Sequence, residues 1–444
     1  MRKLATWLLA MLVTSSTVFI QSCKTDDDGE DPTIVTPPVG ETITVKGTIT
    51  TATTWSAANK YILEGFVYVD NNATLTIEPG TIIKGDKLTK GSLIIKPGAK
   101  IMAEGTAAKP IIFTSSAAKG ARNYGDWGGV VLLGKAPVNK TPATIEGENV
   151  STFGGTDAAD NSGTLKYVRI EFAGIAFETD KEINGLTFGG VGSGTTIDYV
   201  QVSYSGDDAY EWFGGTVNAK HLISYRTLDD DFDTDWGYSG RVQFGMALRD
   251  PSVADQCSCS DSNGFESDND SNGSDATPQT SAKFSNMSIF IAPGTVNAKY
   301  RSAFRIRRNS AVSIYNSVVS GAYPKGGLEL EGTATQANFT TGKSDYQGLV
   351  FTGMSKSIVT GDSTLLSAAA RKNIFGAAVA DLKLDAAYNT LGTGFKALPQ
   401  TGSSLLTGGV TLPTGFEATT YVGAFGTTDW TASWTNFDPQ NAEY

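Results

Sequence analysis

Histidine and cysteine are almost absent from this sequence, and their scarcity removes several classes of chemistry. Among 444 residues there is one histidine, His221, at the start of the segment HLISY, and there are three cysteines. A lone imidazole has no second histidine for a proton relay or a histidine-rich zinc site, which argues against hydrolase triads and zinc chemistry. Cys257 and Cys259 stand in a CSC segment, where they either form a small strained disulfide or remain thiols.

Basic residues are also in deficit. The chain has 35 lysines and arginines against 46 aspartates and glutamates, which gives a formal net charge of -11. An excess of negative charge disfavours binding to a nucleic-acid backbone or to an anionic lipid surface. We therefore expect no nucleic-acid partner, and cations are the more natural ligands.

Segments typical of helices are scarce, and after the first residues so are long apolar runs. Thr, Ser, Gly, Val and Ile are abundant, which favours strands and tight turns over helices. The N-terminus, MRKLATWLLAMLVTSSTVFIQSC, has a basic start and one short apolar run, as in a signal peptide covering residues 1–22. No later apolar run is long enough to span a bilayer.

The end of that N-terminal segment predicts a lipid anchor. Residues 20–23, IQSC, resemble a bacterial lipobox, which would make Cys23 the acylated first residue of the mature chain. The following KTDDDGED resembles the acidic signal that sends lipoproteins of the Bacteroidota to the outer face of the outer membrane. The polar, Pro-rich DPTIVTPPVG completes a tether over residues 23–43.

The rest of the chain repeats. LTIEPGTIIKG at 75–85 matches LIIKPGAKIMAEG at 93–105 at an offset of 18, and YVRIEFAG, YVQVSYSG and HLISYR match one another further on. Short strands separated by Gly or Pro-Gly turns at a period near 20 indicate a solenoid. We predict an all-β chain, a right-handed parallel β-helix over 44–360, and a stacked ion pair between Glu78 and Lys96.

Two segments depart from the repeat. The Ser-, Asn- and Asp-rich residues 251–283 predict a long loop leaving the stack. Residues 364–388 are Ala-rich with apolar residues at helical spacing, so we expect a short helix or two in a partly helical C-terminal segment, 361–444. That segment should cap the solenoid or pack on it.

Two acidic segments repeat at an interval of 22 residues. SGDDAYEWFGG at 205–215 aligns with TLDDDFDTDWG at 227–237, so equal positions should stack about 4.8 Å apart in successive coils. Like charges at that distance repel unless a cation lies between them, and Ca²⁺ prefers carboxylate oxygens. The alternative is that the acids are solvated, or paired with nearby bases such as Lys220 and Arg249. The predicted Ca²⁺ ligands are Asp207, Asp208, Glu211, Asp229, Asp230 and Asp233.

Three other groups of residues bear on the same site. Glu266, Asp268 and Asp270 would add oxygens if the 251–283 loop folds back. Trp212 and Trp236 either stack on a sugar or lie inside the coils, whereas for Phe213 and Phe232 we favour the interior. On the strand FRIRRN, Arg305 and Arg307 share one face, with Arg308 on the other. They would either hold an anionic ligand group or pair with the acids.

Several longer stretches resemble a widespread family of Bacteroidota β-helix lipoproteins. They include GFVYVDNNATLTIEPGTIIKGD, YGDWGGVVLLGKAP and YVGAFGTTDWTASWTNFDPQN. The resemblance covers nearly the whole mature chain. It implies the fold, an address on the outer membrane facing the cell exterior, and work beside a TonB-dependent transporter, but no established activity.

A broader resemblance is to the pectin-lyase-like fold, which hosts lyases, hydrolases and adhesins. In pectate lyases, stacked aspartates hold Ca²⁺ and an Arg or Lys removes a proton; the resemblance offers Arg226 or Lys220 for that catalytic role. We therefore expect a surface lipoprotein that binds a carbohydrate or polyanion with Ca²⁺. The alternatives are a Ca²⁺-dependent polysaccharide lyase acting on uronates, and a structural surface module without ligand.

Overall fold

The computed structural model describes residues 40–444 except 149, 179–180 and 257–260, and these residues form a stack of coils. Nearly all strands belong to one continuous parallel sheet wound around a core, a right-handed parallel β-helix as predicted. In the part of the chain described, no helix has the length and apolarity needed to cross a membrane. Four predictions concern residues outside those described: the signal peptide, the acylation of Cys23, most of the 23–43 tether and the state of the CSC segment.

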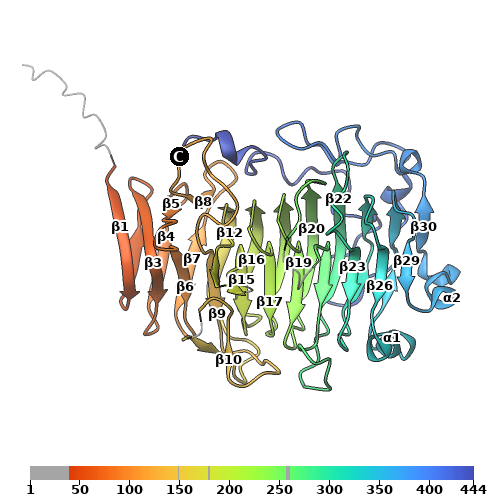
Figure 1. The fold of residues 1–444 in the computed structure, drawn as a ribbon, viewed down its shortest axis with the longest axis horizontal. Helices are drawn as coiled ribbons and strands as arrows, with labels where there is room; N and C mark the ends of the chain where they lie inside the picture. Colours follow the sequence, from red (N-terminus) through yellow and green to blue (C-terminus); the bar gives the residue numbers. More distant parts are fainter. Residues whose placement is uncertain (1–39, 149, 179–180, 257–260) are drawn as a thin grey trace, which may run out of the picture. The chain divides into compact units, whose positions relative to one another are not determined.

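The coils have three faces, which we name A, B and C (Figure 1). Strands β1 (Thr42–Ile49) and β3 (Lys60–Val69) begin on face C and end on face A. Face A continues through β6 (Ser92–Ile95), β9 (Val130–Leu133), β15 (Leu186–Gly189), β17 (Tyr210–Phe213), β19 (Phe232–Asp235), β21 (Phe265–Ser267), β23 (Ser302–Ile306), β26 (Gly326–Leu330) and β29 (Ile358–Thr360).

Faces B and C share five long strands that bend where the faces meet. These are β12 (Gly163–Glu171), β16 (Thr196–Ser203), β18 (Asn218–Tyr225), β20 (Arg241–Arg249) and β22 (Lys283–Ile291). Face B also has β2 (Thr53–Trp55), β4 (Thr74–Ile77), β7 (Lys100–Glu104), β24 (Ser313–Tyr315) and β27 (Tyr346–Gln347). Face C adds β5 (Ile82–Gly85), β8 (Ile111–Ser115), β25 (Val318–Ser320), β28 (Val350–Thr352) and β30 (Ile374–Ala377).

The bend between faces B and C is made by residues with positive φ. Tyr199 and His221 stand at this corner with φ of 55° and 50°. Their rings stack with centroids 4.2 Å apart, and His221 also stacks on Phe244 at 5.1 Å. His221 Nδ1 lies 2.7 Å from a carboxylate oxygen of Asp198. The single histidine therefore belongs to an aromatic corner stack.

Insertions and short elements leave the stack at its corners. They are the hairpins β10 (Ala143–Thr144) with β11 (Thr152–Phe153) and β13 (Ala176–Glu178) with β14 (Lys181–Glu182), the helices α1 (Thr333–Thr340) and α2 (Ser363–Leu366), and the 3-10 turn η1 (Ala369–Arg371). Three further 3-10 turns, η2 (Val379–Leu382), η3 (Ser404–Leu406) and η4 (Pro439–Asn441), lie in the C-terminal segment after the last strand. The short helices expected in 364–388 are present as α2, η1 and η2, each of three or four residues. β30 lies within the same segment and adds a strand to face C, so the stack runs past residue 360 to Ala377.

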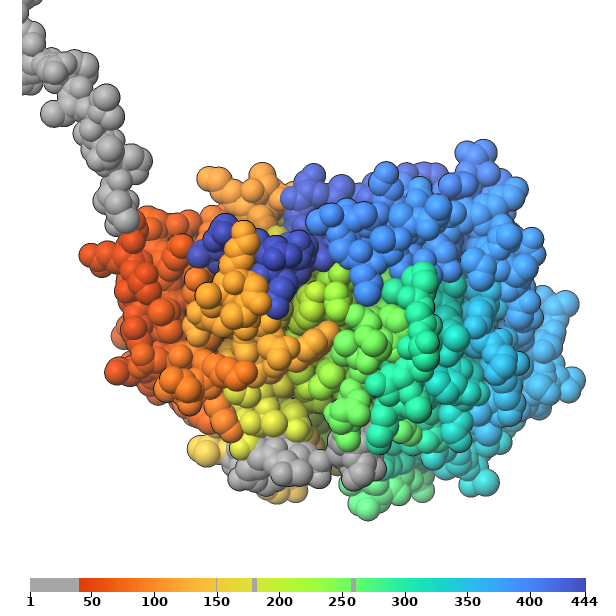
Figure 2. Space-filling view, turned by 45° about the horizontal axis from the view of Figure 1, so that its top comes forward, coloured from red at the N-terminus to blue at the C-terminus, as the bar shows by residue number. Residues whose placement is uncertain are grey.

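Residues 378–444, which we call the strap, return along face C toward the first coils (Figures 1 and 2). Apolar strap side chains such as Phe425 and Trp434 cover an apolar stripe on face C that includes Met246 and Phe290. Near its end the strap accepts a hydrogen bond from Arg122 to the Pro439 carbonyl, at 2.7 Å. The C-terminal segment therefore packs along the side of the solenoid.

Two expectations about spacing are corrected. Leu75 pairs with Ile101, so successive coils are offset here by 26 residues and not by 18. The 18-residue match arises because two similar Pro-Gly turns, at 79–80 and 97–98, lie at different corners of one coil. Lys96 accordingly forms an ion pair with Asp70 at 2.9 Å, and Glu78 accepts a hydrogen bond from the Ala57 amide. The loop expected over 251–283 contains β21, which pairs with β19 and β23 and so belongs to the stack.

Candidate functional site: an acidic hollow on face A

Three carboxylates stand side by side on face A. The register pairs Glu211 with Asp233 and Asp233 with Glu266, so the 22-residue alignment of Glu211 with Asp233 is confirmed. Side chains alternate along a strand, and the flanking Tyr210 and Trp212 point into the core. The three carboxylates therefore project from the outer surface of the sheet, one from each of three successive coils.

The turn before each of these strands carries a second series of side chains. Asn184 Oδ1 accepts the Asp208 N–H at 3.2 Å, and Asp208 Oδ1 accepts the Asp230 N–H at 2.8 Å. Asp230 Oδ1 accepts the Asn263 N–H, and Asn263 Oδ1 accepts the Ser302 N–H at 3.2 Å. One oxygen of Asp208 and one of Asp230 thus hold successive coils together, as the asparagine oxygens do at either end.

The other polar atom of each side chain is an amide nitrogen in the two asparagines and a carboxylate oxygen in the two aspartates. Asn184 and Asn263 use their amide nitrogens to donate to Glu211 and Glu266 respectively. Asp208 and Asp230 have an oxygen there, so carboxylate faces carboxylate. Oxygens of Asp208, Glu211 and Asp233 lie within 4.8 Å of one another. So do those of Asp207, Asp208 and Asp229, and those of Asp230, Asp233 and Glu266.

Burial makes this crowding costly. Asp208 is 6% exposed and Asp230 2%. Burial first, and then neighbouring carboxylates, raise the pKa of Asp208, Glu211 and Asp233 well above the ordinary values. The same causes raise the pKa of Asp235 to about 8. The carboxylates cannot all ionise at neutral pH unless positive charge joins them.

The side chains surround a hollow of about 360 Å³. Insertions build its walls: Glu146 comes from the loop after β10, Glu182 from β14 and Asp255 from the segment after β20. The hollow is lined by Lys140, Glu146, Glu182, Gly206, Asp207, Asp208, Glu211, Phe213, Asp229, Asp230, Asp233, Asp235, Trp236, Asp255, Glu266, Asp268, Ser271, Arg307 and Arg308. All six predicted metal ligands are among them, together with Glu266 and Asp268, whereas Asp270 is not.

The two tryptophans proposed for ligand binding have different surroundings. Trp212 is fully buried between Phe188 and Tyr238, with ring centroids 5.2 and 5.3 Å away, so of the two positions left open for it the interior is the one observed, and it is not a ligand-binding residue. Trp236 borders the hollow but is only 6% exposed. The Lys140 ammonium lies 3.8 Å from its ring centroid and Phe213 packs against it. Phe213 and Phe232 are buried, as we favoured.

The two residues proposed for proton transfer lie elsewhere. Arg226 follows β18 on face C with a φ of 55°, and pairs with Asp250 at 2.5 Å. Lys220 lies on face B and pairs with Glu417 of the strap. Neither residue lines the hollow. Both catalytic assignments are therefore wrong for this site, because sequence proximity to the acids does not bring a side chain to the same face.

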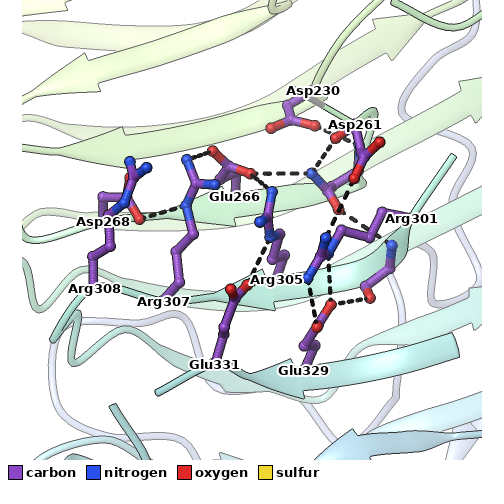
Figure 3. A network of polar contacts seen from close by, with 12 residues as sticks. Asp230, Asp261, Glu266, Asp268, Arg301, Arg305, Arg307, Arg308, Glu329 and Glu331 are labelled. Carbon is purple, nitrogen blue, oxygen red and sulfur yellow. Dashed lines mark hydrogen bonds and ion pairs between the residues drawn. The ribbon is translucent and has the colours of Figure 1, made fainter. Parts of the chain in front are cut away.

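The arginines of the FRIRRN segment are paired with acids (Figure 3). Arg305 donates to Glu266 at 2.9 Å and to Glu331 at 3.0 Å. Arg307 donates to Asp268 at 2.8 Å and also to Glu266. Arg308 lies beyond the end of β23 in the left-handed region, so strand alternation does not apply to it, and it reaches Asp268 at 2.6 Å. Of the two roles left open, charge pairing is the one observed.

A further arginine supports the acidic turn from inside the coil. Arg249 is fully buried, forms an ion pair with Asp231 at 3.0 Å and donates to the carbonyl oxygens of Asp229 and Asn263. The sequence offered Arg249 as a partner for the acids, which the ion pair with Asp231 confirms, but not its hydrogen bonds to the carbonyl oxygens. Asn184, Asn263 and the wall residues Glu146, Glu182 and Asp255 were also missed. For Asn184 and Asn263 a signal existed: NGL and NGF each place a polar residue two positions before an inward apolar residue, as DAY does at 208–210.

Comparison with known proteins identifies the fold family. Residues 47–435 match the family described as the pectate-lyase-like β-helix domain. Neither a curated protein nor a solved structure matches the chain.

Proposed function

The chain belongs to the family of pectate-lyase-like β-helix domains, and from this premise we propose that it binds a carbohydrate or polyanionic ligand through Ca²⁺ held in the acidic hollow. The family fits a carbohydrate-related function in general. The observation that carries the proposal is the packing of buried and half-buried carboxylates from successive coils within 4.8 Å of one another around the hollow.

Electrostatics supports a cation at this place. Two ionised carboxylates 4.8 Å apart repel by about 3 kcal/mol at an effective dielectric constant of about 20. A divalent cation replaces that repulsion by attraction. Ca²⁺ suits the site because it accepts six to eight hard oxygen ligands in flexible geometry. Asp208, Glu211 and Asp233 would be its protein ligands, and the open side of the hollow leaves room for an oxygen of a bound glycan.

Calorimetric titration tests the cation. The purified chain, freed of metal with chelator, should bind Ca²⁺ at a saturable site, and Asp233→Asn should abolish or greatly weaken that binding. Sodium chloride at equal ionic strength is the control for screening. If Ca²⁺ releases no heat beyond this control, the hollow is not a cation site and the structural surface module becomes the better account.

Glycan binding is tested separately, on an array of neutral and acidic polysaccharides with Ca²⁺ and again with chelator. Retention of a glycan only with Ca²⁺ supports the proposal. The lyase alternative needs a base, but the arginines at the hollow are paired. Burial lowers the pKa of the Arg307 guanidinium, yet Glu266 and Asp268 outweigh burial and raise it, so it stays protonated. Ultraviolet absorbance of unsaturated uronate, produced from pectate or alginate, would establish the lyase instead.

The cellular address forms part of the same proposal. We propose acylation at Cys23, anchoring at the outer membrane facing the exterior, and work beside a TonB-dependent transporter that would take up the ligand. The support is the lipobox-like IQSC and the acidic KTDDDGED that follows it. Co-purification of a transporter with the anchored protein from solubilised outer membranes would support the partnership, and its absence from crosslinked membranes would count against it.

A further inference from the structure

The outward series of charges on face A changes sign along the stack. The register aligns Glu211, Asp233, Glu266, Arg305 and Glu329 on successive strands. The first three positions are acidic, the fourth is basic and the fifth is acidic again. The charge is therefore the same on β17 and β19, whereas it alternates from Glu266 on β21 onward.

Guanidinium groups already contact the carboxylate at the third position of the series, Glu266 (Figure 3). Glu266 Oε1 accepts from Arg305 at 2.9 Å, and Glu266 Oε2 accepts from Arg307. Asp268 is held in the same way by Arg307 at 2.8 Å and Arg308 at 2.6 Å. The side chains of Glu266 and Arg305 are 7% and 9% exposed, so little water screens their pairing.

The first two positions have no such counter-ion. Among the described residues, no lysine or arginine forms a salt bridge with Asp208, Glu211 or Asp233. Asp233 Oδ1 is buried and accepts no hydrogen bond from the part of the chain that the structure describes. Among the described residues, guanidinium groups therefore form ion pairs with Glu266 but not with Glu211 or Asp233, on which Arg307 acts only across space, lowering the pKa of Asp233 against the larger effect of burial.

We propose that Arg305 and Arg307 act as counter-ions of Glu266 and thereby restrict the three acidic positions, Glu211, Asp233 and Glu266, to a single divalent cation. The cation binds at the first two positions, to Asp208, Glu211 and Asp233. A second one is excluded from the group Asp230, Asp233 and Glu266 because guanidinium groups hold Glu266. The arginines then determine how many cations bind, and where. This inference rests on the proposed cation site, but its failure is distinguishable from the failure of that site.

The test compares Ca²⁺ stoichiometry in the wild type and in Arg307→Met, by calorimetric titration of the full chain with Ca²⁺ as the only probe. The wild type should bind one Ca²⁺ per chain, whereas the variant should bind two, since Glu266 is left with one guanidinium and an oxygen free to ligate. Arg301→Met is the matched control. Arg301 belongs to the same network but pairs with Glu329, Glu331 and Asp261, so this variant should still bind one.

Glu266→Gln supplies a second measurement that does not depend on the folding of Arg307→Met. If the cation sits at the first two positions, Glu266→Gln should change Ca²⁺ affinity by less than tenfold and leave the stoichiometry at one. Loss of binding in Glu266→Gln would place the cation at the third position and overturn the inference. So would one site in a folded Arg307→Met, or two sites in the wild type. Absence of any wild-type Ca²⁺ binding would instead refute the proposed function.

Discussion

Replacing Asp208 by asparagine should stabilise the metal-free protein and remove most of the further stabilisation that Ca²⁺ gives the wild type. An asparagine keeps the oxygen that accepts the Asp230 N–H. Its amide nitrogen replaces the oxygen that faces Glu211 and Asp233, and can donate as Asn184 donates to Glu211. Asp208→Asn therefore gives this turn the asparagine that Asn184 provides in the preceding coil, and it removes one repelling charge.

The magnitude follows from the spacing. Repulsion between two ionised carboxylates 4.8 Å apart is about 3 kcal/mol at an effective dielectric constant of about 20, and proton uptake in the metal-free protein relieves part of it. A new hydrogen bond adds about 1 kcal/mol, so we expect a gain of about 1 to 3 kcal/mol. Unfolding a chain of about 400 residues has an entropy of roughly 0.8 kcal/mol per degree, so the Tm should rise by about 1 to 4 °C in chelator.

The Ca²⁺ response should show the opposite order. A cation present at 100 times its Kd stabilises the wild type by about 2.7 kcal/mol, which is about 3 °C, and Asp208→Asn should lose most of that gain. Differential scanning calorimetry in chelator and in Ca²⁺ measures both. Glu104→Gln, which removes an exposed acid on β7, is the control and should follow the wild type. A lower Tm of Asp208→Asn in chelator, or an undiminished Ca²⁺ response, would refute the reasoning.

Three further outcomes are expected. Cys23→Ser should prevent acylation and release the protein from the membrane fraction, as mass spectrometry and fractionation would show; continued anchoring would contradict the lipobox assignment. Trp212→Ala should lower the free energy of unfolding by about 3 to 5 kcal/mol by leaving a cavity in the core; denaturant unfolding measures this, and a loss under 1 kcal/mol would contradict the packing described. Arg249→Met should cost a similar amount because it leaves Asp231 buried and unpaired, and the double variant with Asp231→Leu should recover much of the loss in the same assay.

The fold and the acidic row were predictable because a parallel register preserves sequence spacing wherever coils have equal length. The strands β16, β17, β18 and β19 follow one another with that regularity, so Tyr210 and Glu211 lie beside Phe232 and Asp233 as the 22-residue interval requires. Alternating apolar residues and Gly turns were enough to indicate a solenoid.

Spacing failed where coils differ in length or where similar turns recur within one coil. The match of Leu75 with Leu93 compares β4 on face B with β6 on face A, which precede similar Pro-Gly turns but do not pair. Insertions defeat spacing altogether. Glu146 and Glu182 reach the hollow from hairpins outside the stack, and no periodicity connects them with β17.

Sequence spacing also did not predict which side chains are buried or in which direction those at the corners point. Trp212 and Trp236 occupy similar sequence contexts, yet Trp212 lies on a strand where alternation sends it inward, whereas Trp236 lies just past the end of β19 with a φ of 47° and turns toward the hollow. Arg226 shows the same effect at another corner. Side chains at these corners are oriented by left-handed residues, which a two-residue period cannot anticipate.

The charge series on face A links the stability of the middle coils to their surroundings. Equivalent positions in successive coils of a solenoid lie about 4.8 Å apart whatever their side chains. Apolar side chains at these positions stabilise the stack. Charged side chains do so only if positive and negative charges alternate or if an ion binds between like charges. Glu266, Arg305 and Glu329 alternate, whereas Glu211 and Asp233 do not. Each coil contacts mainly its neighbours. Loss of the proposed cation should therefore loosen β17 and β19 more than the end coils, so that occupancy of the hollow, and with it the proposed binding surface, would follow the Ca²⁺ concentration around the protein.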